Sequence, residues 1–514
     1  MSSPSENLAK SLERLRKLQS ENGAAAIRSR DLPRVDRERL LKNGFLQEVM
    51  KGWYVPSRAD EMRGESTAWY ASFWKFCAAY LNERFDAEWS LSPEQSLSLH
   101  AGNWSVPQQL LVRATKAGNK VIQLPHGTSI LDVRASLPAK ENRNDINGLR
   151  LFSLEAALIA SAPTFFKQSP NDARTALSVL KDASSLLSHL LDGGHSLVAG
   201  RLAGAYRNIG RSRVADDIVA TMSAAGYTIR ESDPFEDSIT LHFPKRETSP
   251  YVNRINLLWH AMRGPVIGIF PQVPGLPKNA TQYMQKVDEI YVTDAYHSLS
   301  IEGYKVTTEM IERVRSGNWN PDDNEADRAQ RDAMAARGYW QSFQKVHKSV
   351  ESILNGKNAG EIADQDHGSW YRELFAPSVT AGLLRPSDLA GYRSGQVYIR
   401  GSMHVPMKAE AVSDCMTTFF ELLAEEENAA ARVVLGHFFF VYIHPYMDGN
   451  GRIGRFLMNA MLAAGGYPWT VIPLTARDRY MNALERASTE QNIEPFARLI
   501  SELVTEGPKE VSIS

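Results

Sequence analysis

HFFFVYIHPYMDGNGRIGR, residues 437–455, is the stretch that decides the fold of the C-terminal part of the chain. Its apolar beginning predicts a buried helix that ends at Pro445, because proline has no backbone N–H and cannot continue a helix. The apolar run FLMNAMLAAG (456–465) predicts a second buried helix. The polar turn DGNG (448–451) connects the two. We therefore expect an all-helical core built around two helices and an exposed turn.

The residue types in and beside this turn fit phosphate chemistry. Backbone N–H groups of residues 449–451 lie where the second helix begins, which is a site for anions. Arg452 and Arg455 are three residues apart, so both project from one side of the first helical turn. Asp448 is an oxygen ligand of the kind that Mg²⁺ prefers beside phosphates, and His444 can accept a proton near neutral pH. This combination predicts phosphoryl or nucleotidyl transfer.

Residues 444–455 resemble the signature of the Fic family of nucleotidyltransferases, His-Pro-Phe-x-Asp-Gly-Asn-Gly-Arg-x-x-Arg, with Tyr446 in place of Phe. A kinase-like branch of the family has Asn-Lys where this chain has Asn450 and Gly451, which favours nucleotide transfer over phosphorylation. The resemblance spans roughly residues 285–505. It includes the stretches GYRSGQVYI (391–399), AAGGYPWTVI (463–472) and RDRYMNALERA (477–487).

The resemblance implies a protein adenylyltransferase that transfers AMP from ATP to a Ser, Thr or Tyr hydroxyl of a target protein. It implies that His444 is the catalytic base and that Asp448 holds Mg²⁺ between the α- and β-phosphates. The implied nucleotide-binding residues are Asp448, Gly449, Asn450, Gly451, Arg452, Ile453, Gly454, Arg455, Tyr480 and Met481. His437, seven residues before His444, is interpreted as a packed core residue.

A strand pair is expected near GQVYIRG (395–401). It resembles the family's flap, a small β-hairpin that pins the target segment by main-chain pairing. The target-binding residues that this resemblance implies are Met403, His404 and Val405.

Far upstream, Ser298-Leu-Ser-Ile-Glu302-Gly303 matches the family's inhibitory motif, Ser/Thr-x-x-x-Glu-Gly/Asn. The preceding sequence predicts a helix, in which Ser298 and Glu302 lie on one face. We expect the Glu302 carboxylate to pair with Arg455 in place of the γ-phosphate, leaving ATP in a non-reactive pose. An inhibitory helix before the core is the arrangement of the family's second class.

The N-terminal residues predict a winged helix. A leucine stripe over 5–20 predicts a first helix, Ser29 or Asp31 could cap a short second one, and 34–44 predicts a third helix closed by glycine. Residues 45–56 predict two short strands around a Lys-Gly turn. The stretch 28–55 resembles AbiEi-like winged-helix antitoxins of abortive-infection systems, which implies a regulatory or DNA-binding module.

Basic side chains on the predicted third helix could contact DNA phosphates. These candidates are Arg34, Arg37, Arg39 and Lys42. The alternative is a solvated helix in a protein-binding module.

Between these parts the sequence is less informative. SLSLHAGN (96–103) and KVIQLPHGTSILDV (120–133) alternate like strands, and a helical tract is expected from about 153 to 225. DNEADRAQRD (323–332) is interpreted as a solvated turn or helix start. We expect a mainly α chain with four regions. They are a winged helix at 1–60, an antitoxin-like α/β region at 61–250, a helical region at 251–365 with the inhibitory helix around 285–312, and a Fic core at 366–505.

The composition excludes several classes of protein. The 514 residues include 58 Lys and Arg against 59 Asp and Glu, so the net charge of −1 demands neither nucleic acid nor an anionic membrane. The 2 cysteines show no zinc-site or disulfide spacing. No apolar signal core or membrane-spanning run is present, and we expect a cytoplasmic protein.

Alternatives to a dominant transferase activity remain open at this point. Glu302 could position water to remove AMP from a modified target, using the same site. A different class of protein would be an ATP-sensing, DNA-binding autoregulator of a toxin–antitoxin-like system. The expected partners are ATP with Mg²⁺, a protein with a target hydroxyl, DNA through the winged helix, and a second copy of the chain in a homodimer.

Overall fold

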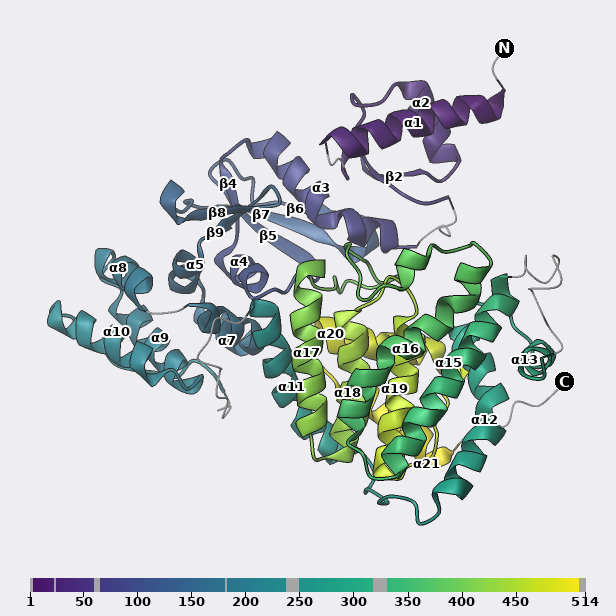
Figure 1. The fold of residues 1–514 in the computed structure, drawn as a ribbon. Coiled ribbons are helices and arrows are strands. Elements are labelled where there is room, and N and C mark those ends of the chain that lie inside the picture. Colours follow the sequence, from purple (N-terminus) through teal and green to yellow (C-terminus); the bar gives the residue numbers. More distant parts are fainter. Residues whose placement is uncertain are drawn as a thin grey trace. The chain divides into compact units, whose positions relative to one another are not determined.

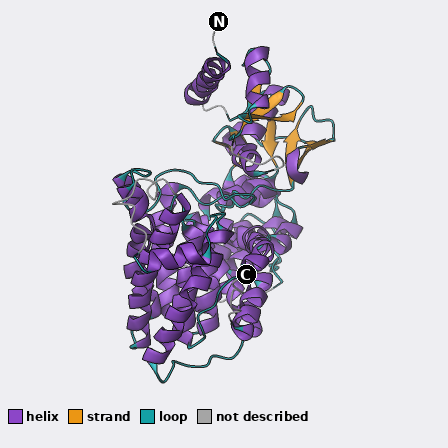
Figure 2. Cartoon of the chain, turned by 90° about the vertical axis from the view of Figure 1, so that its right-hand side faces the viewer, coloured by secondary structure: helices purple, strands orange, loops and turns teal. Residues whose placement is uncertain are grey.

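The structure is a computed structural model that describes residues 3–22, 25–59, 65–180, 183–236, 249–317 and 331–507. The chain forms two compact units. The first contains Met1–Arg254 and Tyr398–Val405, and the second contains Ile255–Val397 and Pro406–Ser514. Figure 1 shows the elements of both units, and Figure 2 shows the strands in orange. The described strands all lie within Met1–Arg254 of the first unit. The predicted mainly α fold is confirmed.

The first unit begins with a small module of two helices and a three-stranded sheet. Its elements are α1 (Pro4–Asn22), β1 (Ile27–Arg28), α2 (Arg34–Lys42), β2 (Leu46–Met50) and β3 (Trp53–Pro56), and the strand order is β1-β3-β2. The predicted hairpin is confirmed, with Gln47 opposite Val55. The predicted helix at Ser29 or Asp31 is wrong, because β1 runs directly into a turn in which the Asp31 carboxylate accepts a hydrogen bond from the Arg28 N–H at 2.8 Å.

A four-stranded sheet follows, covered by long helix α3 (Thr67–Phe85). Its strands are β4 (Trp89–Leu91), β5 (Gln109–Ala114), β6 (Val121–Gln123) and β7 (Ser129–Arg134), in the order β4-β5-β7-β6. β5 and β7 are parallel, with Leu110 opposite Ile130, and both outer strands are antiparallel to their neighbours. The strands predicted within 120–133 are therefore confirmed.

The predicted strand at 96–103 is wrong, because most of it lies in α4 (Pro93–His100). The Ser92 hydroxyl accepts a hydrogen bond from the Gln95 N–H at 3.1 Å, and Pro93 occupies the first helical turn. Both features favour a helix start. The capping signal thus outweighs the Ser-Leu alternation that follows it.

The rest of the first unit is a short hairpin and a group of helices, and the predicted helical tract is confirmed. The hairpin is β8 (Arg143–Ile146) with β9 (Leu149–Phe152). The helices are α5 (Leu154–Ala160), α6 (Pro163–Gln168), α7 (Pro170–Val179), α8 (Ser184–Asp192), α9 (Ser196–Asn208) and α10 (Ser212–Ala224). They share one hydrophobic core.

All the regular secondary structure described in the second unit is helical. α11 (Pro250–Ile269) begins in the first unit and continues into the second. The other helices are α12 (Ala280–Ile301), α13 (Thr308–Arg315), α15 (Arg331–Leu354), α16 (Ala359–Thr380), α17 (Ala409–Glu425), α18 (Ala429–Ile443), α19 (Asn450–Gly465), α20 (Arg477–Thr489) and α21 (Glu494–Glu506). The charged run 323–332 lies mainly outside the described residues.

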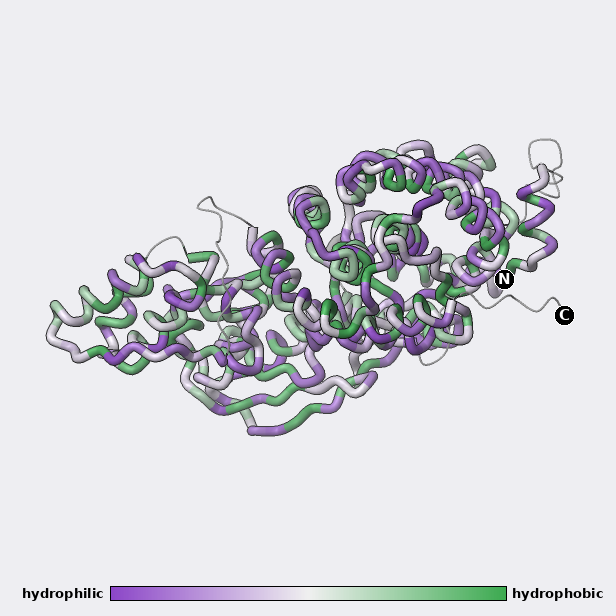
Figure 3. Tube along the Cα trace, turned by 90° about the horizontal axis from the view of Figure 1, so that it is seen from below, coloured by the Kyte–Doolittle hydropathy of each residue, from purple (hydrophilic) through white to green (hydrophobic). Residues whose placement is uncertain are grey.

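The two helices predicted from residues 437–465 are confirmed as α18 and α19, which pack against each other. Almost every side chain of both helices is buried. Other helices show an alternation of hydrophobic and hydrophilic residues around the axis, as Figure 3 illustrates. A helix that is buried all round belongs at the centre of its unit. The turn between α18 and α19 is consequently held from several sides.

The predicted strand pair at 395–401 is wrong, because residues 395–408 contain no strand. The Ser402 N–H donates to the Ile399 carbonyl at 3.1 Å, which makes a turn without a ladder. Residues 398–405 belong to the first unit, where their main chain finds other partners. The Gly401 N–H donates to the Thr67 hydroxyl at 3.1 Å. The Val106 N–H donates to the Met403 carbonyl at 2.8 Å.

Two general features bear on the sequence-based expectations. Cys77 and Cys415 are both buried free thiols. In the part of the chain that the structure describes, none of the helices has the length and apolar character needed to cross a membrane.

Candidate active site

His444 is the residue where α18 ends. Its backbone is left-handed, with φ 55° and ψ 61°, and its N–H still donates to the Phe440 carbonyl at 3.1 Å. Pro445 follows and prevents the helix from continuing. The imidazole Nδ1 lies 3.2 Å from the Val441 carbonyl, so Nδ1 carries the proton and Nε2 keeps a lone pair. Burial lowers the pKa of His444 to about 4.

The polar turn after His444 is closed by Asn450. Its side-chain oxygen accepts from the Tyr446 N–H at 2.9 Å, and its amide donates to the Tyr446 carbonyl at 2.8 Å. The Tyr446 ring is buried and stacks on Tyr371 of α16, with centroids 3.8 Å apart. The aromatic residue at this position of the motif therefore anchors the turn.

Glycine is required at two positions of the turn. Gly449 has φ 80°, and a Cβ there would lie 2.8 Å from the Phe375 ring. A Cβ on Gly451 would lie 2.4 Å from a Glu302 carboxylate oxygen and 3.2 Å from Arg455 Nη1. A side chain at either position would therefore clash with the residues packed around the start of α19.

Arg393 holds the same turn from outside the motif. Its Nε donates to the His444 carbonyl at 2.8 Å, its Nη1 to the Gly395 carbonyl at 2.9 Å and its Nη2 to the Met407 carbonyl at 2.6 Å. Burial lowers the pKa of this guanidinium to about 10. The role of Arg393 could not be predicted, since nothing in a single sequence relates residue 393 to the backbone of residue 444.

Arg452 lies buried between two aromatic rings. Its guanidinium carbon is 5.2 Å from the centroid of Tyr304 and 5.1 Å from that of Phe375, which are cation–π distances. Its Nη2 lies 3.4 Å from Asp448 Oδ1. Its buried Nε has no hydrogen-bond partner among the described residues. A donor in this state needs an acceptor that the protein itself does not supply.

Arg455 is held by the C-terminal end of α12. Its Nε donates to the Ser298 hydroxyl at 2.9 Å, and its Nη2 donates to the Ser298 carbonyl at 3.0 Å and to Glu302 Oε1 at 2.7 Å. Burial alone would lower the pKa of Arg455, but the Glu302 carboxylate raises it above its ordinary value. The contact between Glu302 and Arg455 predicted from the inhibitory motif is confirmed.

Gly303 ends this helix in the way its sequence position suggests. It has φ 86°, and the Tyr304 N–H donates back to the Leu299 carbonyl at 3.1 Å, as in a Schellman motif. The sharp ending places the Glu302 side chain over the first turn of α19. The same segment reaches both arginines, since Tyr304 covers Arg452.

The free donors at the start of α19 define a place for phosphate. Arg455 Nη1, like Arg452 Nε, is buried and has no hydrogen-bond partner among the described residues. Asp448 lies beside them with an exposed carboxylate, and its recorded contacts with Gly449 N–H and Arg452 both use Oδ1. Oδ2 is therefore available to a cation, although the described residues include no group of three or more His, Cys, Asp or Glu that could hold a metal by itself. Mg²⁺ fits such a site because it is commonly held by one carboxylate together with substrate phosphates.

Two of the predicted nucleotide-binding residues, Tyr480 and Met481, lie on α20 (Arg477–Thr489). Tyr480 is buried, and its hydroxyl is 2.8 Å from Nε2 of His437, whereas Met481 is half-buried. Burial lowers the pKa of His437 to about 4, so this ring is neutral at physiological pH. His437 is fully buried against Phe496, which confirms its interpretation as a packed core residue.

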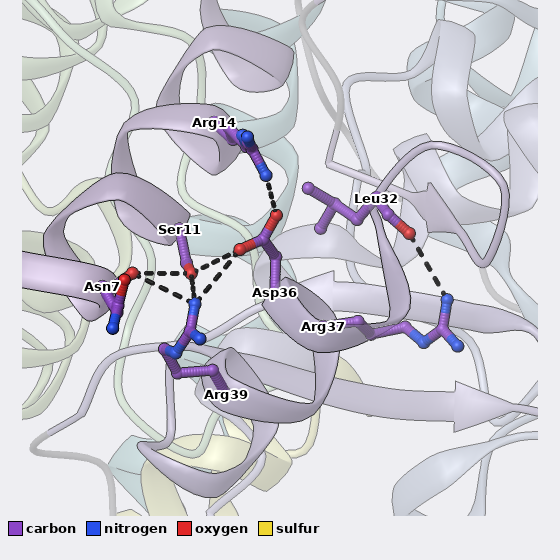
Figure 4. A network of polar contacts seen from close by, with 7 residues as sticks. All are labelled: Asn7, Ser11, Arg14, Leu32, Asp36, Arg37 and Arg39. Atoms are coloured by element: carbon purple, nitrogen blue, oxygen red, sulfur yellow. Dashed lines mark hydrogen bonds and ion pairs between the residues drawn. The ribbon is translucent and has the colours of Figure 1, made fainter. Parts of the chain in front are cut away.

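The remaining predicted sites belong to the first unit. Met403 and Val405 pack against its hydrophobic core, and His404 is buried. In the N-terminal module the candidate DNA-binding arginines make contacts within the protein. Arg34 pairs with Glu38 at 2.7 Å, Arg37 donates to the Ser29 carbonyl at 2.8 Å, and Arg39 lies 3.2 Å from Asp36. Figure 4 shows the network around Asp36, and Lys42 ends α2.

Residues 365–462 match the Fic/DOC family. A protein named "Protein adenylyltransferase Fic" from Drosophila virilis is 30% identical over 218 residues, which are 42% of this chain and 41% of that protein. The protein of the same name from Drosophila willistoni is 29% identical over 218 residues, which are 42% of this chain and 40% of that protein. The chain thus spans about two fifths of the length of these curated relatives.

Solved structures of Fic proteins are also similar to the chain. Fic-1 from C. elegans matches with a TM-score of 0.38 and 17% sequence identity, covering 66% of this chain and 94% of that structure. A Fic domain containing signaling protein from Bacteroides thetaiotaomicron matches with a TM-score of 0.33 and 19% identity, covering 50% of this chain and 93% of that structure.

Proposed function

Because residues 365–462 match the Fic/DOC family, we propose that this chain is a protein adenylyltransferase that transfers AMP from ATP to a hydroxyl group of a protein. The observation that carries the proposal is the set of buried, unpartnered arginine donors at the start of α19, beside a histidine with a free Nε2. An anion site next to a neutral base suits transfer of a phosphorus group to a hydroxyl.

His444 is the proposed general base. With Nδ1 bound to the Val441 carbonyl, Nε2 is the nitrogen that accepts the proton of the target hydroxyl. The hydroxyl oxygen then bonds to the α-phosphorus of ATP, the bond to the β-phosphate oxygen breaks, and pyrophosphate leaves. The low pKa of His444 keeps the imidazole neutral at physiological pH, so that nearly every molecule has the base in its active form.

Arg452 and Arg455 are the proposed phosphate-binding residues, together with the N–H groups of Asn450 and Gly451, whereas the Gly449 N–H donates to Asp448. Arg452 is already fixed between Tyr304 and Phe375, so little conformational entropy is lost when an oxygen anion binds to it. Asp448 would hold Mg²⁺, which would supply neutralisation of the charge on the phosphates.

Glu302 is the proposed inhibitor of the transferase. Its carboxylate occupies Nη2 of Arg455 and lies over Gly451, where a terminal phosphate of ATP would bring its own negative charge. The two anions compete for one guanidinium, so ATP binds in a pose that does not present its α-phosphate to His444. Some relatives use this glutamate to remove AMP instead, and release of AMP from a modified target would identify that activity.

Replacing Glu302 by Gly tests the proposal. We expect self-labelling with radiolabelled ATP to rise about 5- to 150-fold, because couplings between two ligands of one site are commonly of this size. A Glu302→Gly, His444→Ala double variant should label itself about 10²- to 10⁴-fold more slowly than Glu302→Gly, because it lacks the base. Arg455→Ala should not activate, because the same side chain binds the nucleotide. Equal labelling of an active wild type and Glu302→Gly would contradict the inhibitory role, and retention of activity without His444 would contradict the mechanism.

A further inference from the structure

One buried carboxylate on the inhibitory helix has no place in the mechanism above. Asp294 lies eight residues before Glu302, and Ser298 lies between them, so the three side chains share one face of α12. Asp294 is only 4% exposed. A buried carboxylate is costly unless it is paired or hydrogen-bonded, so its partners indicate what it does.

The partner of Asp294 is Tyr339 of α15. The Tyr339 hydroxyl donates to Asp294 Oδ2 at 2.6 Å, which is the short distance of a charge-assisted bond. Tyr339 is fully buried, and its ring lies 4.7 Å from that of Phe456, the residue after Arg455 in α19. One side chain therefore connects the inhibitory helix with the helix that carries the phosphate-binding arginines.

The charges around this contact favour an ionised Asp294. Burial raises the pKa of Asp294 to about 6, while the Tyr339 hydroxyl, the Trp469 side chain and the Arg455 charge oppose that increase. The carboxylate is therefore ionised at physiological pH, and its bond with Tyr339 is correspondingly strong. Arg455 thus faces two carboxylates of α12, with Glu302 in direct contact and Asp294 one helical turn behind Ser298.

We propose that Asp294 and Tyr339 are positioning residues for the inhibitory contact: their bond fixes α12 against α15 so that Ser298 and Glu302 meet Arg455. Glu302 is the last residue before the chain turns at Gly303, and helix ends fray, so a fixed point near this end would limit its motion. Without the bond at Asp294, about two turns earlier, the helix end would move more and Arg455 would exchange Glu302 for nucleotide more often. This inference rests on the proposed function, since it concerns control of that same site.

The test compares Tyr339→Phe and Asp294→Asn with the wild type in the full-length chain, each with and without Glu302→Gly. Hydrogen exchange of residues 294–302 measures the contact itself, and self-labelling with radiolabelled ATP measures its consequence. Tyr339→Phe should speed exchange and raise labelling by up to about 10- to 150-fold, the range expected for losing a hydrogen bond to a charged group. Asp294→Asn should have a smaller effect, because its amide oxygen still accepts from Tyr339.

Ser349→Ala is the matched control on the same helix. The Ser349 hydroxyl also donates at 2.6 Å to a carboxylate, that of Asp366, but this bond connects α15 with α16 instead of α12. A general weakening of α15 would therefore appear in both variants, whereas loosening of the inhibitory helix should appear only with Tyr339→Phe.

Combining each substitution with Glu302→Gly separates a positioning role from general structural damage. If Tyr339 acts through Glu302, Tyr339→Phe should produce no further increase in labelling once Glu302 is Gly. Unchanged exchange of residues 294–302 in Tyr339→Phe, or the same fold-change in labelling on both backgrounds, would overturn the inference. If Glu302→Gly itself gave no increase, the proposed inhibition would fail, and the exchange data would still decide whether Asp294 and Tyr339 hold the helix.

Discussion

At the scale of single residues, His444 combines a left-handed backbone with a pKa far below that of an ordinary imidazole. A residue other than glycine with a positive φ has a strained backbone, which costs free energy. Such strain persists only where neighbouring contacts hold the residue in place. Arg393 provides that hold through the His444 carbonyl, and Asn450 closes the turn behind it. The turn geometry thus fixes the direction of Nε2 before any substrate arrives, which lowers the entropic cost of reaction.

The pH dependence of the proposed transferase activity should report this low pKa. Because burial depresses the pKa of His444 to about 4, the imidazole is neutral and active above that value, and activity is lost only as the pH falls through it. We expect kcat/KM of Glu302→Gly to be constant from about pH 8 to about pH 6 and to fall towards about pH 4. A midpoint near about 6.5, the ordinary value of histidine, would show that His444 is well solvated in the working enzyme.

At the scale of elements, residues 398–405 differ most from expectation, since they pair with the first unit instead of forming a hairpin. Thr67→Val removes the hydroxyl that accepts the Gly401 N–H and keeps the shape of the side chain. We expect hydrogen exchange of Gly401 to become about 2- to 10-fold faster, the effect of losing one hydrogen bond. Thr67→Ser retains the acceptor and is the control. Equal exchange in both variants would mean that other contacts hold this segment.

The N-terminal module depends on one buried carboxylate. Asp36 of α2 accepts from Ser11 at 2.8 Å and pairs with Arg14, both on α1, as Figure 4 shows. Burial by itself would raise the pKa of Asp36, but these partners and Arg39 lower it below its ordinary value. The pairing therefore contributes stability above the ordinary carboxyl pKa of about 4, and this contribution disappears as the pH falls through the depressed value.

Asp36→Asn should accordingly destabilise the packing of α1 on α2 by about 1–3 kcal/mol, because it breaks a largely buried ionic network. Hydrogen exchange of α1 amides in the full-length chain at neutral pH measures this loss. Glu38→Gln breaks the exposed pair with Arg34 instead and should change exchange little. Similar effects of the two substitutions would show that α1 is held by its leucines alone.

At the scale of the whole molecule, a motif within one stretch of sequence is easier to predict than a contact between distant residues. The site at 444–455 could be predicted because its parts lie within one turn and two helix ends. The contact between Glu302 and Arg455 crosses more than 150 residues and was predictable only because the inhibitory motif is itself a local pattern. Arg393, Tyr339 and Asp294 have no such pattern, and their roles depend on tertiary packing alone.

Two local signals compete at 96–103 in the first unit. The alternating residues predict a strand, but the cap at Ser92 and the packing of Leu97 and Leu99 favour a helix. DNA contact through the basic residues of α2 stays a prediction, and in the structure Arg34 pairs with Glu38, Arg39 lies near Asp36 and Arg37 donates to a backbone carbonyl. Charge counted along a sequence omits the partners that folding provides.

Two compact units in one chain predict two responses to the nucleotide. ATP with Mg²⁺ binds only groups of the second unit in the proposed mechanism, so by mass action it should stabilise that unit alone. Thermal unfolding of the full-length chain should show two transitions, of which saturating ATP moves one upward by a few degrees. Glu302→Gly should enlarge that shift of the unfolding temperature, because Arg455 is then available to the phosphates without competition.

Ser349→Ala provides a reference in which the site is unaltered. A single transition that moves as a whole with ATP would show that the two units unfold together, and a movement unaffected by Glu302→Gly would separate nucleotide affinity from the inhibitory contact.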